Sequence, residues 1–188
     1  MTIPNFITVL RFILVPAIIM AMLYGRMDLA FAGFLVAGVS DGIDGFIARQ
    51  FDQRSELGAW LDPVADKLLL VSVVIMLGKL GHLPAWLVVL IVSRDVLIVG
   101  AVILQILFGN PMEVRPLMVS KANTVAQITM VTVALAGLGF GFDIAVILNV
   151  LIGVAALLTV ASGAAYLVTW LRFVGTNDGS GDGTHKQG

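Results

Sequence analysis

Four aspartates lie close together in a chain that is otherwise strongly apolar. Asp41 and Asp44 end one apolar segment, and Asp62 and Asp66 begin the next. Residues three and four apart share a helix face, so each pair would lie on one stripe, beside small residues such as Gly45. Two such stripes facing each other would enclose a space for a ligand. Because ionisable groups in apolar segments are costly, we interpret this stretch as a functional site.

Carboxylates that face one another repel, and a divalent cation would remove that repulsion. The chain contains no cysteine and the aspartates have no histidine nearby, so the oxygen ligands favour Mg²⁺ or Mn²⁺ over Zn²⁺. Four carboxylates can hold two ions when some of them bridge, and paired ions about 4 Å apart recur in phosphoryl chemistry. Arg49, directly after the first pair, could contact a phosphate oxygen.

These residues also have purely structural explanations. Asp62, which precedes Pro63, could cap the N-terminus of a helix. Glycine stripes can serve only close helix packing, and charges near the end of a span can simply reach interfacial water. We favour a site because all four aspartates fall on two matched stripes.

The composition indicates an integral membrane protein. Of 188 residues, 59% are hydrophobic and 12% are charged, whereas soluble domains are about half apolar and a quarter charged. A span needs about 20 apolar residues. Six segments qualify: residues 6–24, 29–49, 59–79, 84–108, 118–139 and 144–173. We therefore expect an all-α fold with six transmembrane helices, one domain over 1–174 and a disordered polar tail over 175–188.

The lysines and arginines predict the orientation, because cytoplasmic loops carry an excess of them. With six spans, both termini lie on one side of the membrane. That side would hold Arg49, Arg54, Arg115, Lys121, Arg172 and Lys186, whereas the other would hold Arg26 and Lys79. We predict that the termini and the aspartate site are cytoplasmic, in the inner or plasma membrane of a bacterium. The net charge of −1 suggests no nucleic-acid partner.

The aspartates belong to a longer pattern, Asp-x2-Asp-Gly-x2-Ala-Arg-x8-Gly-x3-Asp-x3-Asp. Its fixed positions are Asp41, Asp44, Gly45, Ala48, Arg49, Gly58, Asp62 and Asp66. The pattern resembles the signature of the CDP-alcohol phosphatidyltransferase family at every fixed position, and the resemblance extends over nearly the whole chain except the tail. It implies an enzyme in which a hydroxyl attacks the lipid-side phosphorus of a CDP-linked lipid, and CMP leaves.

The resemblance also implies roles for individual residues. One metal ion would be bound by Asp41, Asp44 and Asp62, and the other by Asp41, Asp62 and Asp66. Asp66 would also be the general base for the acceptor hydroxyl. The cytidine diphosphate would lie beside Gly45, Ala48, Arg49 and Gly58, since small residues give the nucleotide room.

The N-terminal stretch "IPNFITVLRFILVP" resembles the phosphatidylglycerophosphate synthase and cardiolipin synthase branch. Asn5, Thr8 and Arg11 fall three apart on one helix face, so Asn5 and Thr8 are candidates for nucleotide binding. Helix capping by Asn5 and snorkelling of Arg11 to the interface are equally good explanations.

Two later stretches, "VSRDVLIVGAV" and "RPLMVSKANTVAQI", look closer to the CMP-forming cardiolipin synthases. Phosphatidylglycerophosphate synthases more often have an Arg-Glu pair and a Gly-Lys-x-Lys-Thr run there. The candidates for the acceptor phosphate are Arg94, Arg115, Ser120 and Lys121. A structural ion pair could instead explain Arg94 and Asp95, and ordinary flanking charge could explain Arg115. Lys67 could bind a lipid phosphate or snorkel.

The sequence thus predicts a metal-dependent transferase that forms cardiolipin and CMP from CDP-diacylglycerol and phosphatidylglycerol. The resemblance further implies a homodimer. One alternative is a phosphatidylglycerophosphate synthase, with glycerol 3-phosphate as the acceptor. A divalent-cation transporter is an alternative of a different class, but it would need a path across the midplane, and here the acids gather at one end of their helices.

Overall fold

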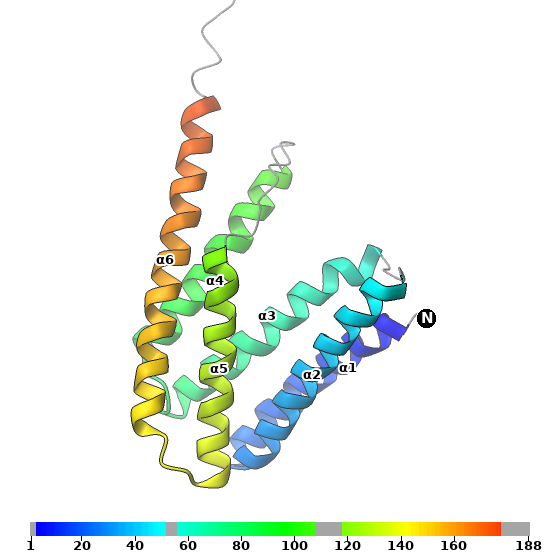
Figure 1. The fold of residues 1–188 in the computed structure, drawn as a ribbon, viewed down its shortest axis with the longest axis vertical. Coiled ribbons are helices and arrows are strands. Elements are labelled where there is room, and N and C mark those ends of the chain that lie inside the picture. The colour runs from blue at the N-terminus through cyan, green and yellow to red at the C-terminus, as the bar shows by residue number, and fades with distance from the viewer. Residues whose placement is uncertain (1–2, 52–55, 108–117, 178–188) are drawn as a thin grey trace, which may run out of the picture.

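The computed structural model describes residues 3–51, 56–107 and 118–177, and within these the side chains of 11–40, 65–100 and 118–168. The described residues form six helices (Figure 1): α1 (Ile3–Leu23), α2 (Met27–Phe51), α3 (Glu56–Lys79), α4 (Ala85–Leu107), α5 (Met118–Phe140) and α6 (Ala145–Asn177). The six predicted helical segments are therefore confirmed at nearly the same positions. Helix α6 continues to Asn177, so residues 175–177 of the predicted disordered tail are helical, and the prediction is wrong there. The rest of the predicted tail, 178–188, lies outside the described residues and stays a prediction.

Tight glycine turns join the helices at one end of the bundle. Gly25 has a φ of 73°, a conformation that side chains with a Cβ rarely adopt. Its N–H bonds to the carbonyl of Met22, and the N–H of Arg26 bonds to the carbonyl of Ala21 at 2.8 Å, which is a Schellman cap. The same arrangement recurs at Gly81 after α3. These short turns make neighbouring helices antiparallel (Figure 1).

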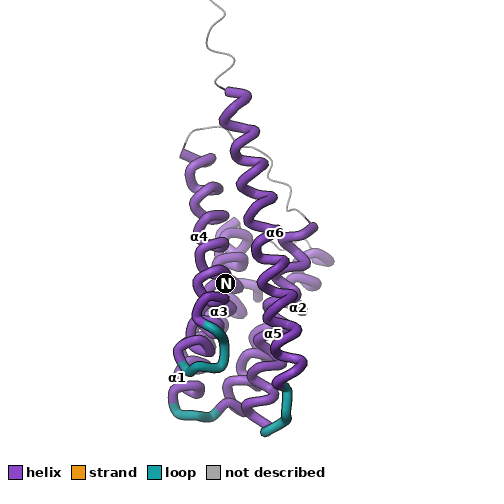
Figure 2. The backbone as a smooth tube through the Cα atoms, turned by 90° about the vertical axis from the view of Figure 1, so that its left-hand side faces the viewer, coloured by secondary structure: helices purple, strands orange, loops and turns teal. Residues whose placement is uncertain are grey.

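The helices pack in two connected groups. Helix α1 packs against α2 and α3, and α6 packs against α4 and α5. Helix α5 also packs along α2, and α3 contacts α4 and α5, so these contacts join the groups (Figures 1 and 2). Among the described side chains, the largest fully buried apolar ones are Ile18, Met22, Val73, Val74, Leu77, Leu87, Ile91, Met130, Val131 and Leu135. They lie on the helix halves that adjoin the glycine turns, so the apolar core fills that end of the bundle.

The outer faces of α4 and α6 are also apolar. They expose Val96, Leu97, Val99, Val146, Ile147, Val150, Leu157 and Val160. A soluble monomer rarely leaves such a continuous apolar surface in water, whereas lipid covers it without cost. These faces therefore suit contact with a bilayer.

Two helices in the described part of the chain are long and apolar enough to cross a membrane. They are Met118–Phe140 and Ala145–Val168, within α5 and α6. Arg11–Leu23 and Met27–Ser40 are apolar but shorter. The predicted all-helical fold is confirmed, and the predicted number of six spans stays a prediction.

Candidate active site

Asp66, the last aspartate of the motif, lies on α3 and forms an ion pair with Arg11 of α1. Helix α1 packs along α3, so it carries the arginine directly to the motif. The Arg11 side chain is only 3% exposed, whereas that of Asp66 is 46% exposed. Snorkelling is therefore the wrong explanation for Arg11, because its guanidinium is buried against the motif. Asp66 is held by a fixed cation and still faces open space.

That open space is a cavity of about 470 Å³ between α2, α3 and α5, and Asp95 of α4 also lies on its wall. Its wall consists mainly of apolar side chains from these helices: Phe34, Leu35, Ala37, Val39, Leu69, Leu70 and Ile128. Asp66, Lys67 and Asp95 supply charge where the wall approaches the motif. The Thr132 hydroxyl also lines the cavity but donates to the carbonyl of Ile128 at 2.8 Å, so its polarity is internally satisfied. Thr124 and Gln127 are further polar residues of the lining, so the cavity combines a mainly apolar wall with a few charged and polar groups.

The described part of the two motif stripes meets at this cavity. Gly38 of α2 and Asp66 of α3 line the same space. A Cβ added to Gly38 would have no neighbour within 4 Å, so the space beside it is open. Asp41 follows Gly38 by three residues and Asp62 precedes Asp66 by four, so both helices continue from the cavity into the rest of the motif.

The helix boundary also removes one structural explanation. Helix α3 begins at Glu56, six residues before Asp62, so Asp62 lies inside the helix. Capping of the helix N-terminus is therefore the wrong explanation for this aspartate.

Metal binding rests on residues that are only partly described. Asp41 and Asp44 lie on α2, and Asp62 lies on α3. The side chains of these three aspartates are outside the described part of the chain, whereas the side chain of Asp66 is described. Within the described residues no group of three metal-ligating side chains occurs. The donor set of the motif is carboxylate only, and carboxylate oxygens are the ligands that Mg²⁺ and Mn²⁺ prefer. The residues therefore fit such an ion in chemistry.

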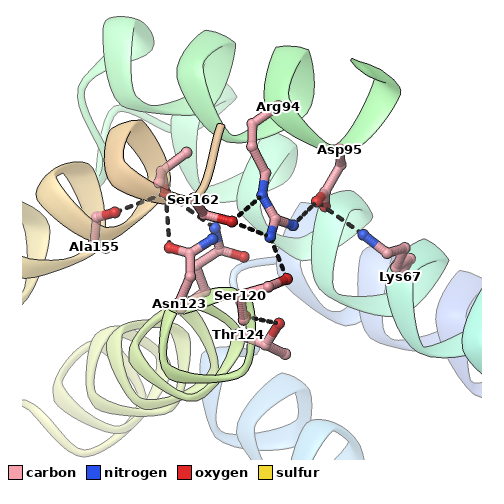
Figure 3. A network of polar contacts seen from close by, with 10 residues as sticks. Lys67, Arg94, Asp95, Ser120, Asn123, Thr124, Ala155 and Ser162 are labelled. Carbon is pink, nitrogen blue, oxygen red and sulfur yellow. Dashed lines mark hydrogen bonds and ion pairs between the residues drawn. The ribbon is translucent and has the colours of Figure 1, made fainter. Parts of the chain in front are cut away.

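A second polar cluster lies between α4, α5 and α6, and Arg94 is at its centre (Figure 3). Its Nη2 donates to Ser120 Oγ of α5 and to Ser162 Oγ of α6, each at 2.6 Å. Its Nε donates to Ser162 Oγ at 3.2 Å, and its Nη1 donates to Asp95 Oδ1 at 2.6 Å. The ring centroid of Tyr166 lies 6.0 Å from the guanidinium carbon, within range of a cation–π contact. One buried arginine thus ties three helices together.

Residues 1–161 match the family model of CDP-alcohol phosphatidyltransferase. The chain belongs to the CDP-alcohol phosphatidyltransferase family. A probable phosphatidylglycerophosphate synthase from Mycobacterium tuberculosis is 32% identical over 177 residues, which cover 91% of this chain and 82% of that protein. A cardiolipin synthase (CMP-forming) from Homo sapiens is 33% identical over 181 residues, covering 88% of this chain and 60% of that protein. A putative cardiolipin synthase from Mycobacterium bovis is 39% identical over 126 residues, covering 66% and 59%.

The family match confirms the resemblance predicted from the motif, and it makes the chain a transferase of phospholipid biosynthesis. Relatives at similar identity carry two different names, so the family does not decide the acceptor.

In this phosphatidyltransferase, two of the predicted acceptor-phosphate residues are brought into contact. Arg94 and Ser120 share a hydrogen bond although they lie on different helices. Lys121 follows Ser120 and is exposed on α5. Arg115 lies outside the described residues, as do the side chains of the predicted nucleotide residues Asn5, Thr8, Gly45, Ala48, Arg49 and Gly58.

Sequence reasoning missed the contribution of α6. Ala155, Thr159 and Ser162 are all buried and follow one another by four and three residues, so they form one inward stripe. Thr159 Oγ1 lies 2.9 Å from Asn123 Oδ1 and accepts a hydrogen bond from Gln127 at 3.3 Å. The sequence did contain a signal for this stripe, because the polar residues Thr159 and Ser162 lie three apart in an apolar span. This stripe positions α5, and through Ser162 it also positions Arg94.

Proposed function

We propose that this phosphatidyltransferase transfers a phosphatidyl group from CDP-diacylglycerol to phosphatidylglycerol, giving cardiolipin and CMP. The observation that supports the proposal most is the placement of Asp66 on the wall of an apolar cavity. A carboxylate that must accept a proton from a lipid hydroxyl needs both an open face and a neighbouring apolar space for the lipid. The cavity between α2, α3 and α5 offers both.

Asp66 is the proposed general base. Its carboxylate faces the cavity and is held by Arg11, so it is oriented before an acceptor arrives. As the acceptor hydroxyl attacks the lipid-side phosphorus of CDP-diacylglycerol, Asp66 takes its proton. The bond between that phosphorus and the bridging oxygen breaks, and the oxygen leaves with CMP. A positioned base of this kind contributes about 10²–10⁴ to a rate.

The CDP-alcohol phosphatidyltransferases are generally dependent on divalent metal ions. Here Asp41, Asp44, Asp62 and Asp66 would hold two Mg²⁺ or Mn²⁺ ions. When bound, such ions would neutralise the diphosphate of the donor and the charge that develops on CMP. The donor nucleotide would lie beside Asn5, Thr8, Gly45, Ala48, Arg49 and Gly58, and the acceptor phosphate near Arg94, Arg115, Ser120 and Lys121.

The apolar wall of the cavity suits the acyl chains of a lipid substrate, and we propose that this lipid is the acceptor. Glycerol 3-phosphate has no acyl chain, so it would leave Phe34, Leu70 and Ile128 without a partner in the bound state. Phosphatidylglycerol would cover them with hydrocarbon, at a gain of about 25 cal/mol per Å² of apolar surface buried. A phosphatidylglycerophosphate synthase is the second candidate, because the relative from Mycobacterium tuberculosis carries that name.

We further propose six transmembrane spans, a cytoplasmic site and cytoplasmic termini, in a homodimer. The outward apolar faces of α4 and α6 and the two membrane-length helices support membrane insertion. Because the chain contains no cysteine, single cysteines introduced at Lys79 and at Thr184 can be labelled with a membrane-impermeant reagent. The topology predicts labelling at these two positions from opposite sides of the membrane, and labelling from the same side would contradict it.

The function is tested with purified protein, CDP-diacylglycerol and Mg²⁺, offering phosphatidylglycerol and glycerol 3-phosphate separately. Mass spectrometry of the lipid product, with CMP measured in parallel, identifies the acceptor. Cardiolipin with an equal amount of CMP is the expected result. Phosphatidylglycerophosphate instead would establish the second candidate, and CMP from neither acceptor would overturn both.

A further inference from the structure

Asp95 accepts hydrogen bonds from two cations through the same carboxylate oxygen. Lys67 Nζ of α3 lies 2.9 Å from Asp95 Oδ1, and Arg94 Nη1 lies 2.6 Å from it (Figure 3). The carboxylate carries one negative charge and the two cations carry two positive charges. Among the described residues, this cluster of Lys67, Arg94 and Asp95 therefore holds one surplus positive charge beside the cavity.

Arg94 is the fixed partner of Asp95. Its side chain is 6% exposed, and beyond Asp95 it donates to the hydroxyls of Ser120 and Ser162. Moving its guanidinium would break these bonds and leave buried polar groups unsatisfied. Arg94 alone can thus balance the charge of Asp95.

Lys67 is the exchangeable partner. Its side chain is 39% exposed, and it lines the cavity together with Asp95 and Asp66. A lysine ammonium has three N–H donors and a flexible stem, so it can leave one acceptor for another nearby. Within the described residues, Lys67 therefore presents the surplus charge to the cavity.

A phosphodiester fits this surplus charge, because it carries one negative charge and accepts hydrogen bonds. We propose that Lys67 binds the phosphate of the lipid in the cavity, exchanging Asp95 for a phosphate oxygen. Arg94 then keeps Asp95 balanced, so the exchange leaves no unpaired charge. Asp95 is a positioning residue that holds the ammonium on the cavity wall while the site is empty. This inference rests on the proposed function, since it assumes that the cavity receives a lipid substrate.

The test compares Lys67→Met and Lys67→Arg with Lys79→Met in the purified full-length protein. Lys79 is an exposed lysine at the other end of α3, which makes it a matched control. KM and kcat are measured for phosphatidylglycerol at saturating CDP-diacylglycerol, and then with the roles of the two lipids reversed. Loss of a charge-assisted hydrogen bond predicts that Lys67→Met raises KM for one lipid about 10- to 100-fold, with kcat changed less than about 3-fold. Lys67→Arg should restore most of the affinity, and Lys79→Met should behave as wild type.

The two arms identify the source of the phosphate. A raised KM for phosphatidylglycerol alone assigns Lys67 to the phosphate of the acceptor. A raised KM for CDP-diacylglycerol alone assigns it to a phosphate of the donor. Either result supports the inference. Unchanged KM values for both lipids, or a loss confined to kcat, would overturn it.

A binding measurement separates this inference from the proposed reaction. Native mass spectrometry in mixed micelles reports binding of phosphatidylglycerol without turnover, with diacylglycerol as a lipid that lacks phosphate. Weaker binding of phosphatidylglycerol but not of diacylglycerol by Lys67→Met would support the inference even if wild type made no cardiolipin. If Lys67→Met bound both phosphatidylglycerol and CDP-diacylglycerol as tightly as wild type does, the inference would be overturned, whatever the reaction proves to be.

Discussion

The two halves of the helix bundle are built differently. In the half next to the glycine turns, the buried side chains are apolar, such as Met22, Leu77 and Leu87. The Arg26–Asp28 ion pair of that half is exposed, at 58% and 41% of its side chains. Farther from the turns, Arg11 and Arg94 are buried and paired with carboxylates. Charge is therefore outside the bundle at one end and inside it at the other.

The difference separates stability from chemistry. Packed apolar side chains hold helices together through many small contacts. Buried ion pairs add little net stability, because the cost of removing charges from water about equals their attraction. The charges of Asp66, Lys67 and Asp95 on the cavity wall are therefore better explained by what they bind. We expect mutations in the two halves to affect different quantities.

The largest effect is expected at Asp66. Asp66→Asn removes the proton acceptor, so turnover should fall about 10²–10⁴-fold. Binding of the CDP-lipid should change little, as measured by equilibrium titration. Asp143→Asn is the matched control, because Asp143 accepts the N–H of Ala145 at the start of α6, a position where asparagine serves equally well. Near-normal turnover in Asp66→Asn would remove this residue as the base.

In the half of the bundle next to the glycine turns, mutations should lower the free energy of unfolding and leave turnover unchanged. Leu77 is fully buried on α3, and Leu77→Ala leaves a cavity that should cost about 2–5 kcal/mol in the free energy of unfolding. Ile75 is 45% exposed on the same helix, so Ile75→Ala should cost much less. Unfolding in a detergent titration measures both, and the turnover of the folded fraction should stay near wild type. Equal stability losses for the two variants would contradict the proposed core.

The smallest effect is expected at the exposed ion pair. Hydrogen bonding from Arg26 holds the pKa of Asp28 below its ordinary value of about 3.9. The native state therefore gains stability from this carboxylate above that pH and loses it as the pH falls through the lowered value. As the pH falls from 5 to below the lowered pKa of Asp28, the melting temperature of wild type should drop slightly more than that of Asp28→Asn. Because both groups are exposed, about 1 M salt should remove the difference, and a difference that persists in salt would show a buried interaction.

Much of the fold was predictable from the sequence. Apolar runs of membrane length and the glycine breaks between them fixed the six helices, because both features act locally along the chain. The motif predicted the family for the same reason, since its eight positions lie within two helices that follow one another.

The partners of the charged residues were not predictable. Arg11 meets Asp66 across 55 residues, and Arg94 meets Ser162 across 68. Such contacts depend on which helices pack together and on how each is rotated, and neither follows from hydropathy in helices that are apolar on most sides. The sequence identified Arg94 and Asp95 as costly charges in a span, but it could not show that Lys67 shares the carboxylate.

The central claim is that the acceptor lipid binds in the cavity between α2, α3 and α5. A substitution at Gly38 tests this claim directly. Gly38 and Gly153 are both exposed and have open space around them, but Gly38 lines the cavity and Gly153 lies on α6. Gly38→Leu and Gly153→Leu are therefore matched substitutions of equal size. The measurement is KM for phosphatidylglycerol at saturating CDP-diacylglycerol, with the melting temperature as a check on folding. We predict that Gly38→Leu raises KM about 10-fold or more, since a filled cavity excludes the acyl chain, while Gly153→Leu matches wild type. A wild-type KM in a folded Gly38→Leu protein would contradict the account, because the acceptor lipid would then bind elsewhere.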